Sequence, residues 1–101
     1  MISIELCRHG YCGAKEDIKY QWPKLRAGGI MAGHDYMTAV TQAQRDPNQD
    51  WSICGDGSIH PGAVKGAVDE FATSHSLTVA VTYRQPDWPS WLMVKPTSKV
   101  P

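Results

Sequence analysis

Three consecutive polar-tipped residues, His34, Asp35 and Tyr36, are the first candidates for chemistry in this 101-residue chain. They follow the apolar run at residues 30–32, which is too short for a helix and is typical of a strand covered on both faces. Ligands of open α/β sheets bind beyond the carboxyl ends of the strands. A carboxylate there can hold a hard cation or orient a hydroxyl group, and a nearby histidine can accept a proton.

Asp35 and His34 are therefore candidate catalytic residues, and Tyr36 is a candidate for substrate binding. A second interpretation of Asp35 stays open, in which its side chain hydrogen-bonds the backbone of residues 36–38 and shapes a turn.

Several elements must position these residues. The alternation in residues 1–7 predicts a strand. Apolar residues spaced four, four and three apart predict a helix that ends near Pro23, because proline cannot continue it. Gly28-Gly29 predicts a tight turn before the apolar run. Pro61 is placed to begin a second helix, whose apolar stripe is Val64, Ala67, Val68 and Phe71.

The last third of the chain predicts two strands, at residues 77–83 and 90–95. The short turn between them favours an antiparallel pair, with Trp88 and Trp91 packing in the hairpin rather than forming a substrate platform. Residues 37–59 are expected to form a long irregular loop, which Trp51 and Ile53 pin to the domain.

These elements predict an α/β fold, a partial Rossmann-like doubly wound sheet that ends in an antiparallel hairpin. It would hold about four strands and two main helices. The domain is expected to span residues 1–96, with a tail at 97–101.

Charge and composition exclude several partners. Lysine plus arginine and aspartate plus glutamate both number 10, so nothing favours nucleic acid or an anionic membrane surface. No apolar run is long enough for a membrane span, and the start of the chain does not read as a signal peptide. The odd cysteine count, Cys7, Cys12 and Cys54, favours reduced thiols in a cytoplasmic protein.

The spacing gives no cofactor-binding or metal-binding residues. No pair of cysteines or histidines has the spacing of a metal site. Neither Gly28-Gly29 nor Gly55-Asp56-Gly57 follows a strand and opens a helix, as a dinucleotide-type fingerprint requires.

The order helix, Pro-Lys-Leu, Gly-Gly, apolar strand, His-Asp-Tyr resembles the fifth-strand region of class I S-adenosylmethionine-dependent methyltransferases, in the small-molecule O-methyltransferase-like branch. The resemblance runs from about Arg8 to Pro96, and methyltransferases of this class also end in an antiparallel hairpin. Aligning on Arg8, His9 and Tyr11 makes His9 and Tyr11 substrate-binding candidates, although His9 can equally be a loop residue without a role. Leu6 then occupies a position that is acidic in the family, which argues against a metal-dependent mechanism.

The resemblance implies a part of an enzyme that transfers a methyl group from S-adenosylmethionine to a small molecule. The donor-binding half of the family domain has no counterpart in the sequence, so we expect the isolated chain to be inactive and not to bind the donor. The alternative is a non-enzymatic α/β interaction module. In both cases the free edge of the first strand predicts self-association, or a partner that supplies the missing strands.

Overall fold

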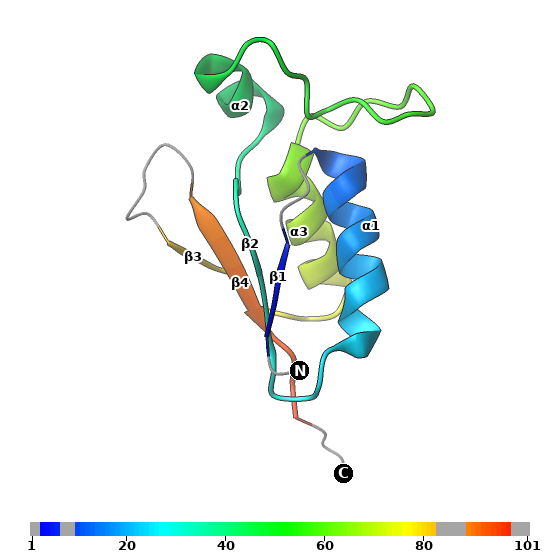
Figure 1. Ribbon diagram of the computed structural model, residues 1–101, viewed down its shortest axis with the longest axis vertical. Helices are drawn as coiled ribbons and strands as arrows, with labels where there is room; N and C mark the ends of the chain where they lie inside the picture. The colour runs from blue at the N-terminus through cyan, green and yellow to red at the C-terminus, as the bar shows by residue number, and fades with distance from the viewer. Residues whose placement is uncertain (1–2, 7–9, 83–88, 98–101) are drawn as a thin grey trace.

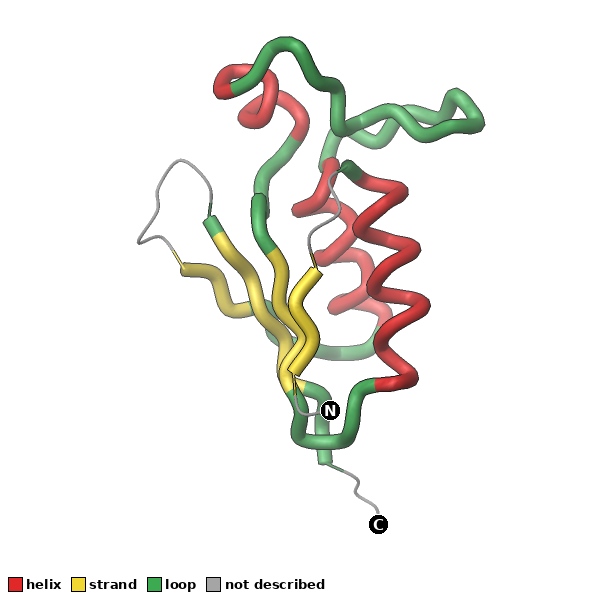
Figure 2. The backbone as a smooth tube through the Cα atoms, viewed as in Figure 1, coloured by secondary structure: helices red, strands yellow, loops and turns green. Residues whose placement is uncertain are grey.

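The computed structural model describes residues 3–6, 10–82 and 89–97 of the chain, which form a mixed α/β fold (Figures 1 and 2). The sheet has four strands in the order β1-β2-β4-β3. Its strands are β1 (Ser3–Leu6), β2 (Ile30–Gly33), β3 (Ala80–Thr82) and β4 (Ser90–Val94). The helices are α1 (Tyr11–Gln21), η1 (Trp22–Lys24, a 3-10 helix), α2 (Ala39–Arg45) and α3 (Ala63–Ser74).

Strand β4 lies between β2 and β3 and is antiparallel to both, while β1 pairs with β2 in parallel. The predicted antiparallel pairing of the last two strands is confirmed. The parallel pair is joined through α1, which ends at Gln21 and gives way to the 3-10 turn that contains Pro23. The first helix therefore ends near the proline, as its fixed φ angle and missing N–H predict.

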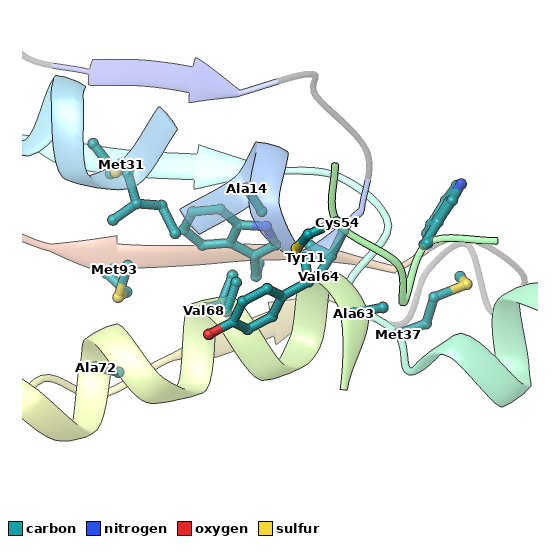
Figure 3. Close-up of a cluster of buried hydrophobic side chains, with 14 of the residues drawn as sticks. Tyr11, Ala14, Met31, Met37, Cys54, Ala63, Val64, Val68, Ala72 and Met93 are labelled. Atoms are coloured by element: carbon teal, nitrogen blue, oxygen red, sulfur yellow. The ribbon is translucent and has the colours of Figure 1, made fainter. Parts of the chain in front are cut away.

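Helices α1 and α3 lie on the same face of the sheet (Figure 1). A core forms between this helix pair and the strands (Figure 3). Ile18 of α1, Val68 of α3, and Met31 and Met93 of the sheet are all fully buried. Trp91 retains 2% exposure, in agreement with its predicted packing role. Trp88 lies outside the described residues.

The opposite face of the sheet is open in the described part of the chain. Ile30 is 39% exposed and Val94 is 50% exposed, and the two are paired across β2 and β4. The prediction that residues 30–32 are covered on both faces is therefore wrong. A doubly wound sheet has helices on both faces, and here both long helices cover one. Apolar side chains alone do not reveal whether a second layer covers them.

The segment expected to be an irregular loop contains α2. Thr38 caps this helix, because its side chain accepts a hydrogen bond from the backbone N–H of Thr41. Trp51 is 6% exposed and attaches the following segment to the core, as predicted. Ile53 is 53% exposed, so its predicted anchoring role is wrong. Its backbone instead forms a bridge to Ile59 at the base of a turn.

Cys12 and Cys54 form a disulfide bond, with their Cα atoms 5.7 Å apart. The prediction of reduced thiols is wrong for these two residues, and Cys7 lies outside the described residues. The pair is separated by 42 residues, so the contact depends on how the loop folds back onto α1 and not on cysteine spacing. Across the described ranges, no helix has the length and apolar character needed to cross a membrane.

Candidate functional site

The parallel strands β1 and β2 end at the same edge of the sheet, and β4 begins there (Figure 1). His34, Asp35 and Tyr36 directly follow β2 at this edge. His9 follows β1 in the sequence but lies outside the residues that the structure describes. The sequence prediction therefore identifies a continuous segment at the carboxyl edge, in which His34 and Tyr36 contact different partners.

His34 is exposed, and its Nδ1 lies 3.2 Å from the Ser90 hydroxyl oxygen at the start of β4. The backbone N–H of Tyr36 donates to the carbonyl of Pro89 at 2.9 Å. These two contacts attach the segment after β2 to the amino end of β4. Because His34 is exposed, a substrate hydroxyl could come within hydrogen-bond distance of its imidazole, which a general base requires.

Asp35 is 8% exposed and has a φ angle of 64°, in the left-handed region that only a few residue types adopt readily. Aspartate is one of these types, and it commonly shapes turns in this conformation. The backbone thus turns sharply at Asp35, directly beyond the strand. Both interpretations of its side chain, in a turn or at a ligand, fit this geometry.

Tyr36 points to α3, where its hydroxyl donates to Asp69 Oδ1 at 2.6 Å. Lys65 Nζ donates to the other carboxylate oxygen at 3.0 Å and lies 5.1 Å from the tyrosine ring centroid. Burial, followed by the bond to the Asp69 carboxylate, raises the pKa of Tyr36. The same carboxylate raises the pKa of Lys65. Tyr36 is thus held as a neutral phenol against the helix.

Tyr11 makes a matching contact from α1. Its hydroxyl donates to Glu70 Oε1 at 2.6 Å, and this bond is the main reason that its pKa is raised. Its ring stacks on His60 with the centroids 3.8 Å apart, and its backbone N–H donates to Trp51. Only 4% of Tyr11 is exposed.

The two substrate-binding candidates Tyr11 and Tyr36 therefore bond adjacent carboxylates of α3, Glu70 and Asp69, and fix that helix from two sides. Both acidic residues lie outside the apolar stripe predicted for this helix, and the stripe alone does not reveal these bonds. The partners are 59 and 33 residues apart, so no local spacing signals them. Ser90 and His60 were missed for the same reason.

The described residues contain no group of three histidine, cysteine, aspartate or glutamate side chains that could hold a metal ion. A hollow of about 220 Å³ lies between α1 and α3, lined by Lys15, Ile18, Ala67, Glu70, Phe71, Ser74 and His75. None of the described candidate residues lines it, so this hollow is separate from the candidate chemistry.

No protein-family model, curated protein or solved structure matches this chain. The function is therefore argued from the chain itself.

Proposed function

We propose that this chain is the acceptor-side part of a class I S-adenosylmethionine-dependent methyltransferase, in the small-molecule O-methyltransferase-like branch. The observation that carries the proposal is the sheet order β1-β2-β4-β3, with an antiparallel β4 inserted next to a parallel β1-α1-β2 unit. Methyltransferases of the resembled class end in such a hairpin. The position of His34 and Asp35 directly after β2 supports the same proposal. Under this proposal, the protein is cytoplasmic.

The described residues do not fit the methyl donor. The turn at Gly28 precedes β2, and its N–H is used by the carbonyl of Lys95. Gly10 is the glycine between β1 and α1, but there the first helical N–H, from Tyr11, donates to Trp51. A Cβ at Gly10 would also approach the Trp51 backbone to 3.4 Å, so the described residues of this turn, Gly10 and Tyr11, form no open anion cradle. The donor must be held by another segment or chain.

The role left for this chain is to orient the acceptor and remove its proton. A hydroxyl group near the carboxyl edge would meet an accessible imidazole, His34, beside a carboxylate, Asp35. Methyl transfer is an in-line displacement, so much of its acceleration comes from orientation. General-base assistance contributes typically about 10²–10⁴-fold.

The isolated chain should show no saturable heat when S-adenosylmethionine is titrated into it. The decisive experiment extends the chain with the in-frame coding sequence upstream of Met1, where we expect a glycine-rich strand–turn–helix unit. The extended protein should bind the donor and transfer labelled methyl groups to hydroxyl-bearing small molecules. His34→Gln and Asp35→Asn should lower kcat/KM by about 10²–10⁴-fold, while Glu16→Gln on the exposed face of α1 serves as the control.

Three results would refute parts of this proposal. A micromolar donor site on the isolated chain would refute its assignment as the acceptor-side part alone. An extended protein that does not bind the donor would refute the methyltransferase proposal. An active extended protein that tolerates both substitutions would refute the assignment of His34 and Asp35.

The second candidate function is a non-enzymatic interaction module. It is favoured by the bonds that commit Tyr11 and Tyr36 to α3, and by the open apolar pair Ile30 and Val94. Such a module would self-associate or bind a partner that pairs with β1, because an open strand edge templates pairing. Sedimentation of the chain at rising concentration tests this alternative, and a monomer at all concentrations would count against self-association.

A further inference from the structure

Residues 52–60 form a small hairpin, here called the 52–60 hairpin. Its internal bonds run from the Cys54 N–H to Ser58, from the Gly57 N–H to Cys54 and from the His60 N–H to Ser52, at 2.7–2.9 Å. Ile53 and Ile59 are 53% and 65% exposed. The hairpin therefore gains little from burying apolar side chains, and its attachment must come from elsewhere.

Two contacts join the hairpin to the beginning of α1. The first is the Cys12–Cys54 disulfide bond, and the second is the stacking of His60 on Tyr11 with 5° between the ring planes. Both partners in α1 lie in its first turn, beside the carboxyl edge (Figures 1 and 3).

The preceding segment, residues 39–51, is held by different contacts. Gln42 is fully buried, and its side-chain amide donates to the carbonyls of Asp46 and Gln49 at 2.8 and 3.0 Å. Its side-chain oxygen accepts from the Trp51 N–H at 3.2 Å. Neither these bonds nor the burial of Trp51 involves a cysteine.

We propose that the Cys12–Cys54 bond is a redox-sensitive latch for the 52–60 hairpin. When the bond is formed, it holds His60 against Tyr11. When a dithiol reduces the bond, the hairpin detaches while residues 39–51 stay folded. In a reducing compartment, a disulfide bond of this kind is usually transient or redox-sensing.

The reaction is a thiol–disulfide exchange. Cys12 is half-buried and Cys54 is 7% exposed, so the incoming thiolate attacks the Cys12 sulfur. A mixed disulfide forms, and the Cys54 sulfur leaves as a thiolate that takes a proton. The second thiol of the reductant then attacks the mixed disulfide. Cys12 is released as a thiol and the reductant becomes a cyclic disulfide, so two electrons pass from the dithiol to the protein.

The test uses the unmodified chain, with dithiothreitol as the dithiol reductant. Three cysteines with two in the bond leave one free thiol before reduction, so a thiol titration should rise from one to three per chain. Amide hydrogen exchange of Cys54, Gly57 and His60 should accelerate by about tenfold or more, as when a local unit opens. The Trp51 amide, which is bonded to Gln42, is the internal control and should not change.

Two variants complete the experiment. Without any reductant, Cys12→Ser should show the fast hairpin exchange of the reduced state. Cys7→Ser should show the same exchange as the wild type, and its thiol titration should rise from zero to two per chain. Three free thiols before reduction, or unchanged exchange in the hairpin after it, would overturn the proposal. Faster exchange of the Trp51 amide after reduction would also overturn the proposal, because the disulfide bond would then stabilise the whole domain and not the hairpin alone. None of these measurements involves methyl transfer, so a failure of the proposed function leaves them interpretable.

Discussion

Gly33, the last residue of β2, lies directly against the indole ring of Trp91. A Cβ added at Gly33 would lie 2.7 Å from three ring atoms, Cε2, Cζ2 and Nε1, whereas carbon atoms in contact prefer about 3.5–4.0 Å. Trp91 is 2% exposed and stands opposite Gly33 in the β2–β4 register. The ring cannot move away without displacing its neighbours in the core, so Gly33→Ala should be destabilising.

The expected loss is about 1–3 kcal/mol of the free energy of unfolding, the usual cost of forcing an extra carbon into a packed core. Because 1.4 kcal/mol corresponds to about tenfold, the folding equilibrium constant should fall about 5- to 140-fold. A small domain has about 5–15 kcal/mol in total, so the variant should fold with a clearly lower denaturation midpoint.

Urea unfolding followed by tryptophan fluorescence measures this change, provided that the slope m stays constant. Gly55→Ala is the matched control, because a Cβ there meets no atom within 4 Å, and it should stay within about 0.5 kcal/mol of the wild type. In a Trp91→Leu background the cost of Gly33→Ala should shrink, giving a coupling energy of about 0.5–3 kcal/mol. A Gly33→Ala variant as stable as Gly55→Ala, or an equal cost in both backgrounds, would refute the reasoning.

Three further predictions follow from other contacts described above. Gln42→Ala should cost about 1–3 kcal/mol, because it removes the partner of buried backbone groups, whereas the exposed Gln44→Ala should be near neutral in the same urea assay. Tyr11 should ionise above its usual pKa of 10.0 and Tyr20 below it, since Glu70 raises the first and Lys24 lowers the second. The bond from Tyr11 therefore stabilises the fold fully below pH 10.0, and this contribution is lost as the pH rises through the raised pKa. Side-chain NMR of the two phenols would show this order, and Tyr11 ionising together with Tyr20 would contradict it. The amides of β1 (Ser3–Leu6), at the edge of the sheet, should exchange faster than those of the central β4, and equally slow exchange would mean that the β1 edge is covered.

Local patterns predicted the two long helices, α1 and α3, well, although they missed α2. The stripe that includes Ile18 in the first helix, and Val64 and Val68 in the second, identifies the side chains that the structure buries. The turn before β2 was also predicted from the sequence. Gly28 has a φ angle of 84° there, a conformation that favours glycine. In each case the information lies within a few residues of the element.

The sequence was less informative where distant parts of the chain meet. The partner of Tyr11 on α3 and the partner of Cys12 in the hairpin are separated from them by 59 and 42 residues, and neither spacing has a recognisable pattern. The exposure of Ile30 was missed because the sequence of a short apolar strand does not show whether one or both faces of its sheet are covered. The candidate site was placed at the carboxyl edge because its residues are consecutive, whereas what each side chain contacts there depends on the tertiary fold.

Lys95 lies at the end of the molecule that is far from the candidate site. Its Nζ donates to the carbonyls of Trp22 and Leu25, and its backbone bonds both Gly28 and Gly29. The turn between α1 and β2 is therefore completed by a residue about 70 positions later in the chain. During synthesis, this turn can be completed only after Lys95 has left the ribosome, so the amino-terminal third cannot finish folding on its own.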